Sequence, residues 1–180
     1  DAYQNDHQEG QVLIRQLRQL TRGALAEMRS LLMELRPSAV MEARLGDLLR
    51  QLAEALIGRT NIVVKLDVHG DCRMPDEVHM GLYRIAQESI TNIIKHAKAS
   101  KVNISLMCEK MTGNVYNVTM EIKDNGRGFD PAAVPGSRFG LLDLRERAQA
   151  IGAELNLESS PGKGAKIQTI WRGKVVQSGK

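Results

Sequence analysis

The sequence predicts an α+β fold in which one layer of helices covers one face of a β-sheet. Helical apolar periodicity fills the first third of the 180-residue chain, and alternating apolar and polar stretches follow between further helical segments. Apolar residues make up 42% of the chain but aromatic residues only 3%, so the core must be largely aliphatic. Helices followed by mixed elements favour a two-layer arrangement.

A long helix is expected at the N-terminal end. Between Gln11 and Arg36, apolar residues recur at intervals of four and three, which marks a narrow stripe. Pro37 is expected to end this helix. The stripe favours a partner helix from the same or a second chain, and packing on the chain's own globular domain is the alternative. It consists of Leu13, Leu17, Leu20, Ala24, Met28, Leu31 and Leu35.

The other elements follow from the same two periodicities. Turns at 112–114 and 161–164 are expected to join two pairs of strands, and the residues after Trp171 are expected to form a frayed tail. The expected helices span about 45–58, 77–97 and 141–151, and the expected strands 61–70, 102–110, 115–124, 154–160 and 165–171.

Composition excludes several classes of function. The formal net charge is +4, but acidic and basic residues are interleaved along the chain, which argues against a nucleic-acid partner. Cys72 and Cys108 lack the spacing of a zinc or redox motif, so a reducing compartment is expected. No apolar run is long enough to cross a bilayer and no signal peptide is evident, so we expect a cytoplasmic domain.

The helix expected over 77–97 carries a polar face. Glu88, Asn92 and Lys95 are four and three positions apart, which places their side chains along one side. An acid, an amide and an amine suit a magnesium-phosphate complex, because the hard cation prefers oxygen ligands and the phosphate needs positive charge. The alternative is a solvated face with helical ion pairs, which is the simpler explanation for this helix alone.

Two glycine-containing segments follow. In DNGRGFD, Gly126 and Gly128 let the backbone come close to a ligand, and Asp124 can accept a hydrogen bond from an exocyclic amine. In FGLL, Gly140 begins a helix, where free N–H groups favour phosphate. An ordinary turn and a plain helix cap are the alternatives.

In this order, the three segments resemble the ATP-binding domain of the family of sensor histidine kinases, gyrase-type topoisomerases, Hsp90 chaperones and mismatch-repair ATPases. YRIAQESITNIIKHAKAS resembles the N box of that family, and DNGRGFD resembles its first glycine box. FGLLDLRERAQAIGAELNLESSPGKGAKI resembles the second glycine box with the closing hairpin. The resemblance covers about Leu45 to Trp171. It implies a Bergerat-type fold, a mixed sheet covered on one face by helices, preceded by a long dimerisation-type helix.

Within the family, QESITNIIKHA, LRERA and the short lid between Phe129 and Gly140 resemble the histidine kinase subgroup typified by nitrate sensors. LTRGALAEMRSLLMELRP resembles its second dimerisation helix. This resemblance implies three regions. They are a remnant of the dimerisation region over 1–40, an ATP-binding catalytic domain over 41–172 and a disordered tail over 173–180.

The resemblance also implies two cofactors, ATP and Mg²⁺. Asn92 would bind Mg²⁺ through its side-chain oxygen, and Asp124 would bind the adenine amino group. Gly126 and Gly128 would shape the adenine pocket. Glu88 matches the acid that activates water in the hydrolytic relatives, and we count it with Asn92 as a candidate catalytic residue.

The remaining implied roles concern phosphate and the lid. Lys95 and His96 would lie near the phosphates, while Gly140 and Leu141 would form the hinge of the lid. One departure from the family pattern is Ala165, which stands where a threonine is usual and removes a hydroxyl near the adenine.

The implied reaction is transfer of the ATP γ-phosphoryl group to a histidine outside this chain, for relay to the receiver domain of a response regulator. The acceptor histidine is not visible, because His7 lies in a polar segment without apolar periodicity, and His69 and His79 are expected at the surface. The parent would be a homodimer, anchored in the membrane, if at all, by segments outside this chain. The alternatives are a conformational ATPase and a non-catalytic nucleotide-binding module.

Overall fold

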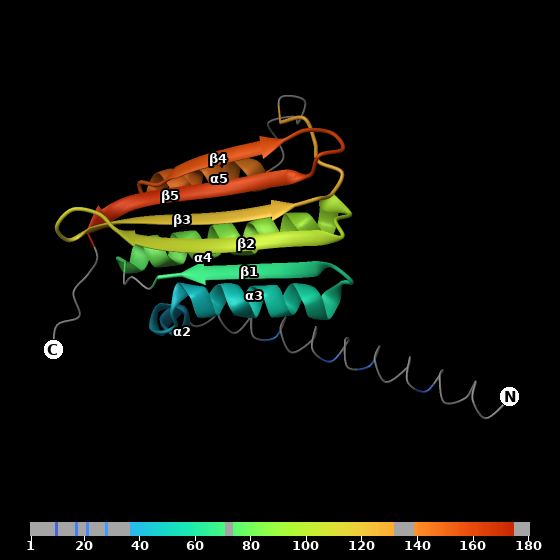
Figure 1. Cartoon of the computed structure of the whole chain (residues 1–180), viewed down its shortest axis with the longest axis horizontal. Helices are drawn as coiled ribbons and strands as arrows, with labels where there is room; N and C mark the ends of the chain where they lie inside the picture. Colours follow the sequence, from blue (N-terminus) through green and yellow to red (C-terminus); the bar gives the residue numbers. More distant parts are fainter. Residues whose placement is uncertain are drawn as a thin grey trace, which may run out of the picture.

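The computed structural model describes residues 10, 17, 21, 28, 37–70, 74–131 and 139–174. Five strands form one sheet, and helices pack against one of its faces (Figure 1). The predicted α+β fold with two layers is therefore confirmed. The predicted N-terminal helix and its apolar stripe fall outside the described residues, except for isolated positions such as Leu17 and Met28.

Each helix and strand predicted after Pro37 is present, with shifts at the ends. The helices are α2 (Pro37–Glu42), α3 (Leu45–Arg59), α4 (Asp76–Asn92), the π-helix η1 (Ile93–Ala97) and α5 (Phe139–Ala150). The strands are β1 (Val63–His69), β2 (Lys101–Lys110), β3 (Val115–Asp124), β4 (Glu154–Ser159) and β5 (Ala165–Lys174).

The sheet is mixed and has the strand order β1-β2-β3-β5-β4. β1 and β2 are parallel, because α4 crosses over between them, and the other neighbours are antiparallel. Lys123 of β3 pairs with Lys166 of β5. The end of β3 therefore lies beside the start of β5, which brings Asp124 close to the hairpin that precedes Ala165.

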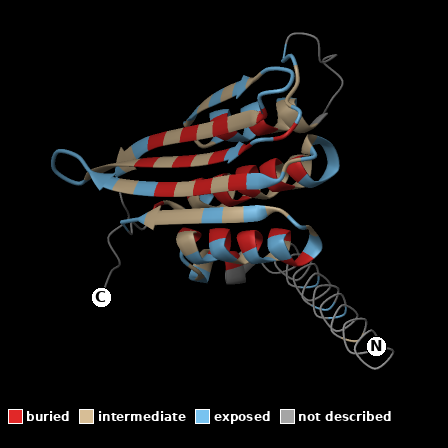
Figure 2. Cartoon of the chain, turned by 45° about the vertical axis from the view of Figure 1, so that its right-hand side comes forward, coloured by how far each residue is buried: buried red, intermediate tan, exposed pale blue. Residues whose placement is uncertain are grey.

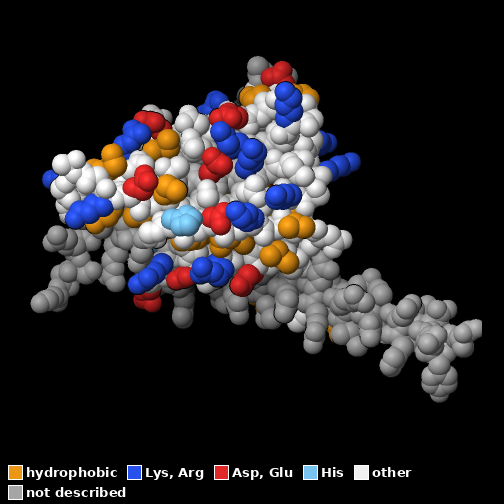
Figure 3. Space-filling model, in the orientation of Figure 1, with side chains coloured by type: hydrophobic (Ala, Val, Ile, Leu, Met, Phe, Trp, Pro, Cys, Tyr) orange, Lys and Arg blue, Asp and Glu red, His pale blue; other side chains and the backbone are white. Residues whose placement is uncertain are grey.

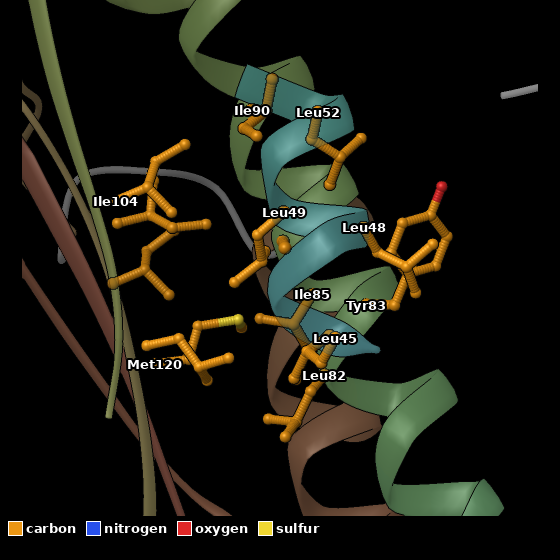
Figure 4. Close-up of a cluster of buried hydrophobic side chains, with 14 of the residues drawn as sticks. Leu45, Leu48, Leu49, Leu52, Leu82, Tyr83, Ile85, Ile90, Ile104 and Met120 are labelled. Carbon is orange, nitrogen blue, oxygen red and sulfur yellow. The ribbon is translucent and has the colours of Figure 1, made fainter. Parts of the chain in front are cut away.

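The core lies between the sheet and the helices. Buried residues alternate with mostly half-buried ones along the central strands, as Figure 2 shows, because successive side chains of a strand point to opposite faces. The α3 side chains Leu45, Leu48, Leu49 and Leu52 meet α4 and the sheet. Figure 4 shows this cluster, with Leu82, Tyr83, Ile85 and Ile90 of α4, Ile104 of β2 and Met120 of β3.

Regular structure reaches slightly further at both ends of the described globular part than the sequence indicated. Pro37 begins α2, because proline fits the first turn of a helix, where its missing N–H is not needed. Val40 of α2 is only 1% exposed, so α2 packs against the globular part of the chain. At the other end, β5 continues to Lys174, which pairs with Val115. Gly173 and Lys174 therefore belong to the sheet and not to a tail.

Cys108 on β2 forms a disulfide bond. A disulfide bond is unusual in the reducing compartment that the spacing of the cysteines led us to expect. Spacing along the chain carried no signal of the bond, because a disulfide depends on distance in space.

The sheet face opposite the helices is polar. Figure 3 shows acidic and basic side chains mixed across this face, and several form ion pairs. Lys65 Nζ lies 2.8 Å from Asp67 Oδ2, and Lys166 Nζ lies 2.6 Å from Glu158 Oε1. Among the helices that the structure describes, none is long and apolar enough to cross a membrane.

Candidate functional site

Glu88 and Asn92 form a hydrogen-bonded pair near the end of α4. The Asn92 Nδ2 atom donates to Glu88 Oε1 over 3.1 Å, and both side chains are half-buried. One helical turn separates them, which is the spacing that places two side chains on one face. The predicted shared face is confirmed for these two residues.

Lys95 and His96 lie beyond the end of the regular helix. The helical segment ends at Ala97 as predicted, but residues from Ile93 onward form the π-helix η1 in place of a regular α-helical turn. A π-helical turn contains an extra residue, so the stacking expected for Lys95 at three positions from Asn92 does not apply. Both side chains are exposed, and in the described part of the chain neither forms a hydrogen bond or ion pair with Glu88 or Asn92.

Asp124, the last residue of β3, is a buried carboxylate with 5% exposure. The Gly126 N–H donates to Asp124 Oδ1 over 2.7 Å, and the Ala165 N–H also donates to this carboxylate. Burial raises the pKa of the Asp124 carboxyl above its usual value, and these two hydrogen bonds partly offset that effect. The carboxylate is therefore held in one orientation by backbone donors.

Asn125 attaches the loop to the start of β2. Its Oδ1 accepts hydrogen bonds from the N–H groups of Ser100 and Lys101, at 3.0 and 2.8 Å. Its Nδ2 donates to Ser100 Oγ over 2.9 Å. This side chain was not among the predicted site residues, because Asn-Gly by itself indicated only a turn.

The two predicted loop glycines are required by close packing. A Cβ atom at Gly126 would lie 2.3 Å from the carbonyl oxygen of Ala97. At Gly128, with φ of +57°, a Cβ would lie 2.1 Å from the Ser160 carbonyl oxygen. The Arg127 N–H donates to the Ala97 carbonyl over 2.8 Å. The loop therefore packs directly against the end of the helix that carries Glu88 and Asn92.

The closing hairpin supplies further contacts that the sequence did not indicate. A Cβ at Gly164 would lie 2.1 Å from the Asp124 carbonyl oxygen. Ser159 Oγ accepts from the Phe129 N–H and donates to the Gly164 carbonyl, each over 2.9 Å. The hairpin lies some 30 to 40 residues after Asp124 and Phe129 along the chain. Only strand pairing brings them together.

Gly140 places the first turn of α5 against the Glu88 and Asn92 pair. A Cβ at this position would lie 2.7 Å from Glu88 Oε1 and 3.4 Å from Asn92 Nδ2. Leu141 is partly buried and packs against the core. The N-terminal end of α5, where the first N–H groups of a helix have no partner within the helix and carry positive partial charge, therefore lies next to the polar face of α4.

His69 and His79 do not form part of this site. His7 lies outside the described residues, and His69 is exposed at the end of β1. His79 in the first turn of α4 is half-buried and not fully at the expected surface position, and desolvation lowers the pKa of its imidazole.

The side chains and backbone groups at this site limit the kinds of ligand that it could bind. Among the described residues, no group of three His, Cys, Asp or Glu side chains could hold a metal ion by itself. Asn92 Oδ1 has no protein donor in the described part of the chain, so this oxygen is free to bind a hard cation together with ligand phosphates. A buried carboxylate acceptor, a tightly packed glycine loop and a helix N-terminus suit a flat base joined to a phosphate-metal group.

The fold and this set of residues define an ATPase-type nucleotide-binding domain. Residues 77–173 match the family model "Histidine kinase-, DNA gyrase B-, and HSP90-like ATPase". The match begins in α4 and ends in β5, so it includes every predicted site residue. The chain belongs to this family.

Curated relatives are sensor kinases. The chain is 33% identical over 155 residues to the signal transduction histidine-protein kinase/phosphatase DegS of Brevibacillus brevis, covering 86% of this chain and 39% of that protein. It is 32% identical over 152 residues to the sensor protein VraS of Staphylococcus saprophyticus, covering 84% and 42%. The chain thus spans about two fifths of the length of these relatives.

Solved structures with similar folds are also from histidine kinases. The histidine kinase domain of a blue-light activated kinase from Erythrobacter litoralis aligns with a TM-score of 0.53 and 26% identity, over 71% of this chain and 60% of that one. The ATP-binding domain of PrrB from Mycobacterium tuberculosis aligns with a TM-score of 0.54 and 25% identity, over 75% and 96%. Its coverage indicates that the globular part of this chain corresponds to a whole ATP-binding domain.

Proposed function

We propose that this chain is the ATP-binding catalytic module of a two-component sensor histidine kinase. The observation that carries the proposal is the contact between the two predicted parts of the site. The Asp124–Gly128 loop packs on Ala97 at the end of the helical segment, and one helix turn earlier the same segment carries Asn92. The family match and the kinase names of the relatives support the same conclusion.

The adenine would bind beside the glycine loop. Asp124 is suited to accept a hydrogen bond from the adenine amino group, because backbone N–H groups already fix its orientation. Gly126 and Gly128 would shape this pocket, since their lack of side chains lets the loop lie close to its neighbours. The site would discriminate against bases that lack the amino group, because such a base would leave the buried Asp124 carboxylate without a hydrogen-bond donor from the ligand.

The phosphates would lie between the end of α4 and the start of α5. Asn92 Oδ1 would hold Mg²⁺, which neutralises charge on the phosphates when it is bound. The α5 N-terminus would add N–H donors, and Lys95 and His96 would supply positive charge from η1. Gly140 and Leu141 would act as the hinge of a lid formed by the preceding segment.

The reaction would be transfer of the γ-phosphoryl group to a neutral histidine nitrogen on a helix outside this chain. Such transfer depends mainly on positioning and on neutralising charge, which are the tasks of the residues above. The phosphohistidine would then pass its phosphoryl group to an aspartate on the receiver domain of a response regulator. We expect a parent homodimer of the nitrate-sensor-like subgroup, with this domain on the cytoplasmic side.

Radiolabelled ATP tests the proposal. The chain is mixed with a fragment that carries the acceptor helix of the parent protein, and the expected product is acid-labile, base-stable label on that fragment. A fragment with its acceptor histidine replaced by glutamine is the matched control. Asn92→Ala should lose both the label and the magnesium dependence of nucleotide binding. ATP binding without any labelled fragment would instead favour a conformational ATPase or a binding module.

A further inference from the structure

We propose that Glu88 is a positioning residue, which holds the Asn92 amide so that its oxygen faces the metal-phosphate group. This inference rests on the proposed function, because it assigns a role within the same site. It gives Glu88 a role different from that of the water-activating acid of the hydrolytic relatives, which Glu88 matches in sequence. Three features of the structure support it.

The first feature is the direction of the hydrogen bond. An ionised carboxylate only accepts hydrogen bonds, whereas an amide has one donor end and one acceptor end. With Glu88 Oε1 at 3.1 Å, the donor end of Asn92 must face Glu88, because the flipped amide would place two acceptors against each other. The oxygen of Asn92 must then point away from Glu88.

The second feature is that Asn92 Oδ1 stays free. Within the described part of the chain, the hydrogen bond to Glu88 is the side-chain interaction that Asn92 makes. A single amide oxygen that is already oriented loses less conformational entropy on binding a cation than a freely rotating one. Glu88 therefore prepares the ligand before the metal arrives.

The third feature is the contact with Gly140. The 2.7 Å approach that a Cβ would make to Glu88 Oε1 means that the first turn of α5 closes one side of the carboxylate. The positive end of this 12-residue helix stabilises a negative charge there. Glu88 is therefore held between Asn92 and α5, and any shift of α5 reaches Asn92 through this carboxylate.

A magnesium titration separates a positioning role of Glu88 from a direct role in the chemistry. Binding of a fluorescent, non-hydrolysable ATP analogue is measured in wild type, Glu88→Ala and Glu88→Gln. In Glu88→Ala we expect unchanged metal-free binding and a magnesium requirement raised by roughly 10- to 100-fold, as is typical when a partner of a metal ligand is removed. Glu88→Gln should recover most of the loss, because its amide oxygen can still accept from Asn92. Glu54→Ala, which removes an exposed acid of α3, is the control.

Side-chain amide NMR signals of Asn92 provide a readout without nucleotide or metal. In wild type and Glu88→Gln, the Nδ2 protons should exchange slowly with water, and in Glu88→Ala they should exchange at the rate of an exposed amide. Equal exchange in all three proteins would overturn the proposal.

The outcomes also separate this inference from the proposed function. If Glu88→Ala and Glu88→Gln both lose phosphoryl transfer while the magnesium requirement stays that of wild type, Glu88 acts in the chemistry and the positioning role is wrong. If wild type binds no nucleotide in the presence of magnesium, the proposed function fails and this inference fails with it.

Discussion

The two parts of the site are built by different means. The Asp124–Gly128 loop is held by backbone groups, with contacts to Ala97, Ser160 and Gly164 that leave no room for a Cβ atom. The Glu88 and Asn92 pair depends on one hydrogen bond between half-buried side chains. The base side of the site is therefore rigid and intolerant of substitution, whereas the phosphate side can be adjusted by side chains.

The largest effect should come from breaking the rigid side. Gly128→Ala should lower the free energy of unfolding by about 2–5 kcal/mol, because a left-handed residue costs about 1–2 kcal/mol and displaced backbone adds about 1–3 kcal/mol. Chemical denaturation measures the change. Gly113→Ala is the matched control, since Gly113 also has positive φ but nothing within 4 Å of the place where a Cβ atom would lie. Equal losses in the two variants would show that the loop is looser than its contacts indicate.

An intermediate effect should come from Asp124, where the rigid side meets the base. Asp124→Asn should weaken ATP binding by about 1–3 kcal/mol, the usual cost of one lost buried partner, in a calorimetric titration. Discrimination between ATP and ITP should shrink as well, because ITP lacks the exocyclic amine. Asp47→Asn on the exposed side of α3 should change neither quantity. Unchanged discrimination would place the base elsewhere.

The same carboxylate gives a signed pH dependence. Its pKa is raised in the folded protein, so the folded state takes up a proton before the unfolded state does as the pH falls. The cost of burying the charge acts above the folded pKa and disappears below it. The free energy of unfolding of wild type, relative to Asp124→Asn, should therefore rise as the pH falls from neutral towards the ordinary pKa of an aspartate. Parallel denaturation curves of the two proteins across this pH range measure the difference.

The smallest effect should come from the end of η1, where helix and loop meet. Lys98 has φ of +52°, a conformation that costs a residue with a Cβ about 1–2 kcal/mol. Lys98→Gly should relieve this strain but increase the entropy of the unfolded chain, for a net gain of about 0.5–1 kcal/mol in thermal unfolding. ATP affinity should not change, because the Ala97 carbonyl contact is retained. A loss of affinity would mean that Lys98 itself contacts the phosphates.

Much of the fold followed from local patterns. The leucines of α3 recur with helical spacing, and apolar residues alternate along β2 and β3. These regular spacings match the buried positions in the structure, so the local sequence was enough to predict these helices and strands. The ends of the elements were less predictable. β5 extends to Lys174 because β3 provides a partner strand, and η1 forms where the helix end meets the Arg127 N–H.

The features of the site also fall into two groups, those that the local sequence indicated and those that it did not. Residue types and their spacing along the sequence indicated Glu88, Asn92 and the glycines of the loop, since these are properties of short segments. The contacts of Asp124 with Ala165, of Ser159 with Phe129 and of Gly140 with Glu88 join segments that lie far apart in the chain. No local pattern carries that information.

By itself, therefore, the sequence determined the order of elements, the aliphatic core and the polar residues available for binding. Only the tertiary structure decided how these residues are oriented. A helix face or a glycine pair has many possible neighbours, and strand pairing together with helix packing selects one of them. For this reason Asp124 is fixed by the backbone of a distant hairpin, and the Asn92 amide by a carboxylate beneath α5.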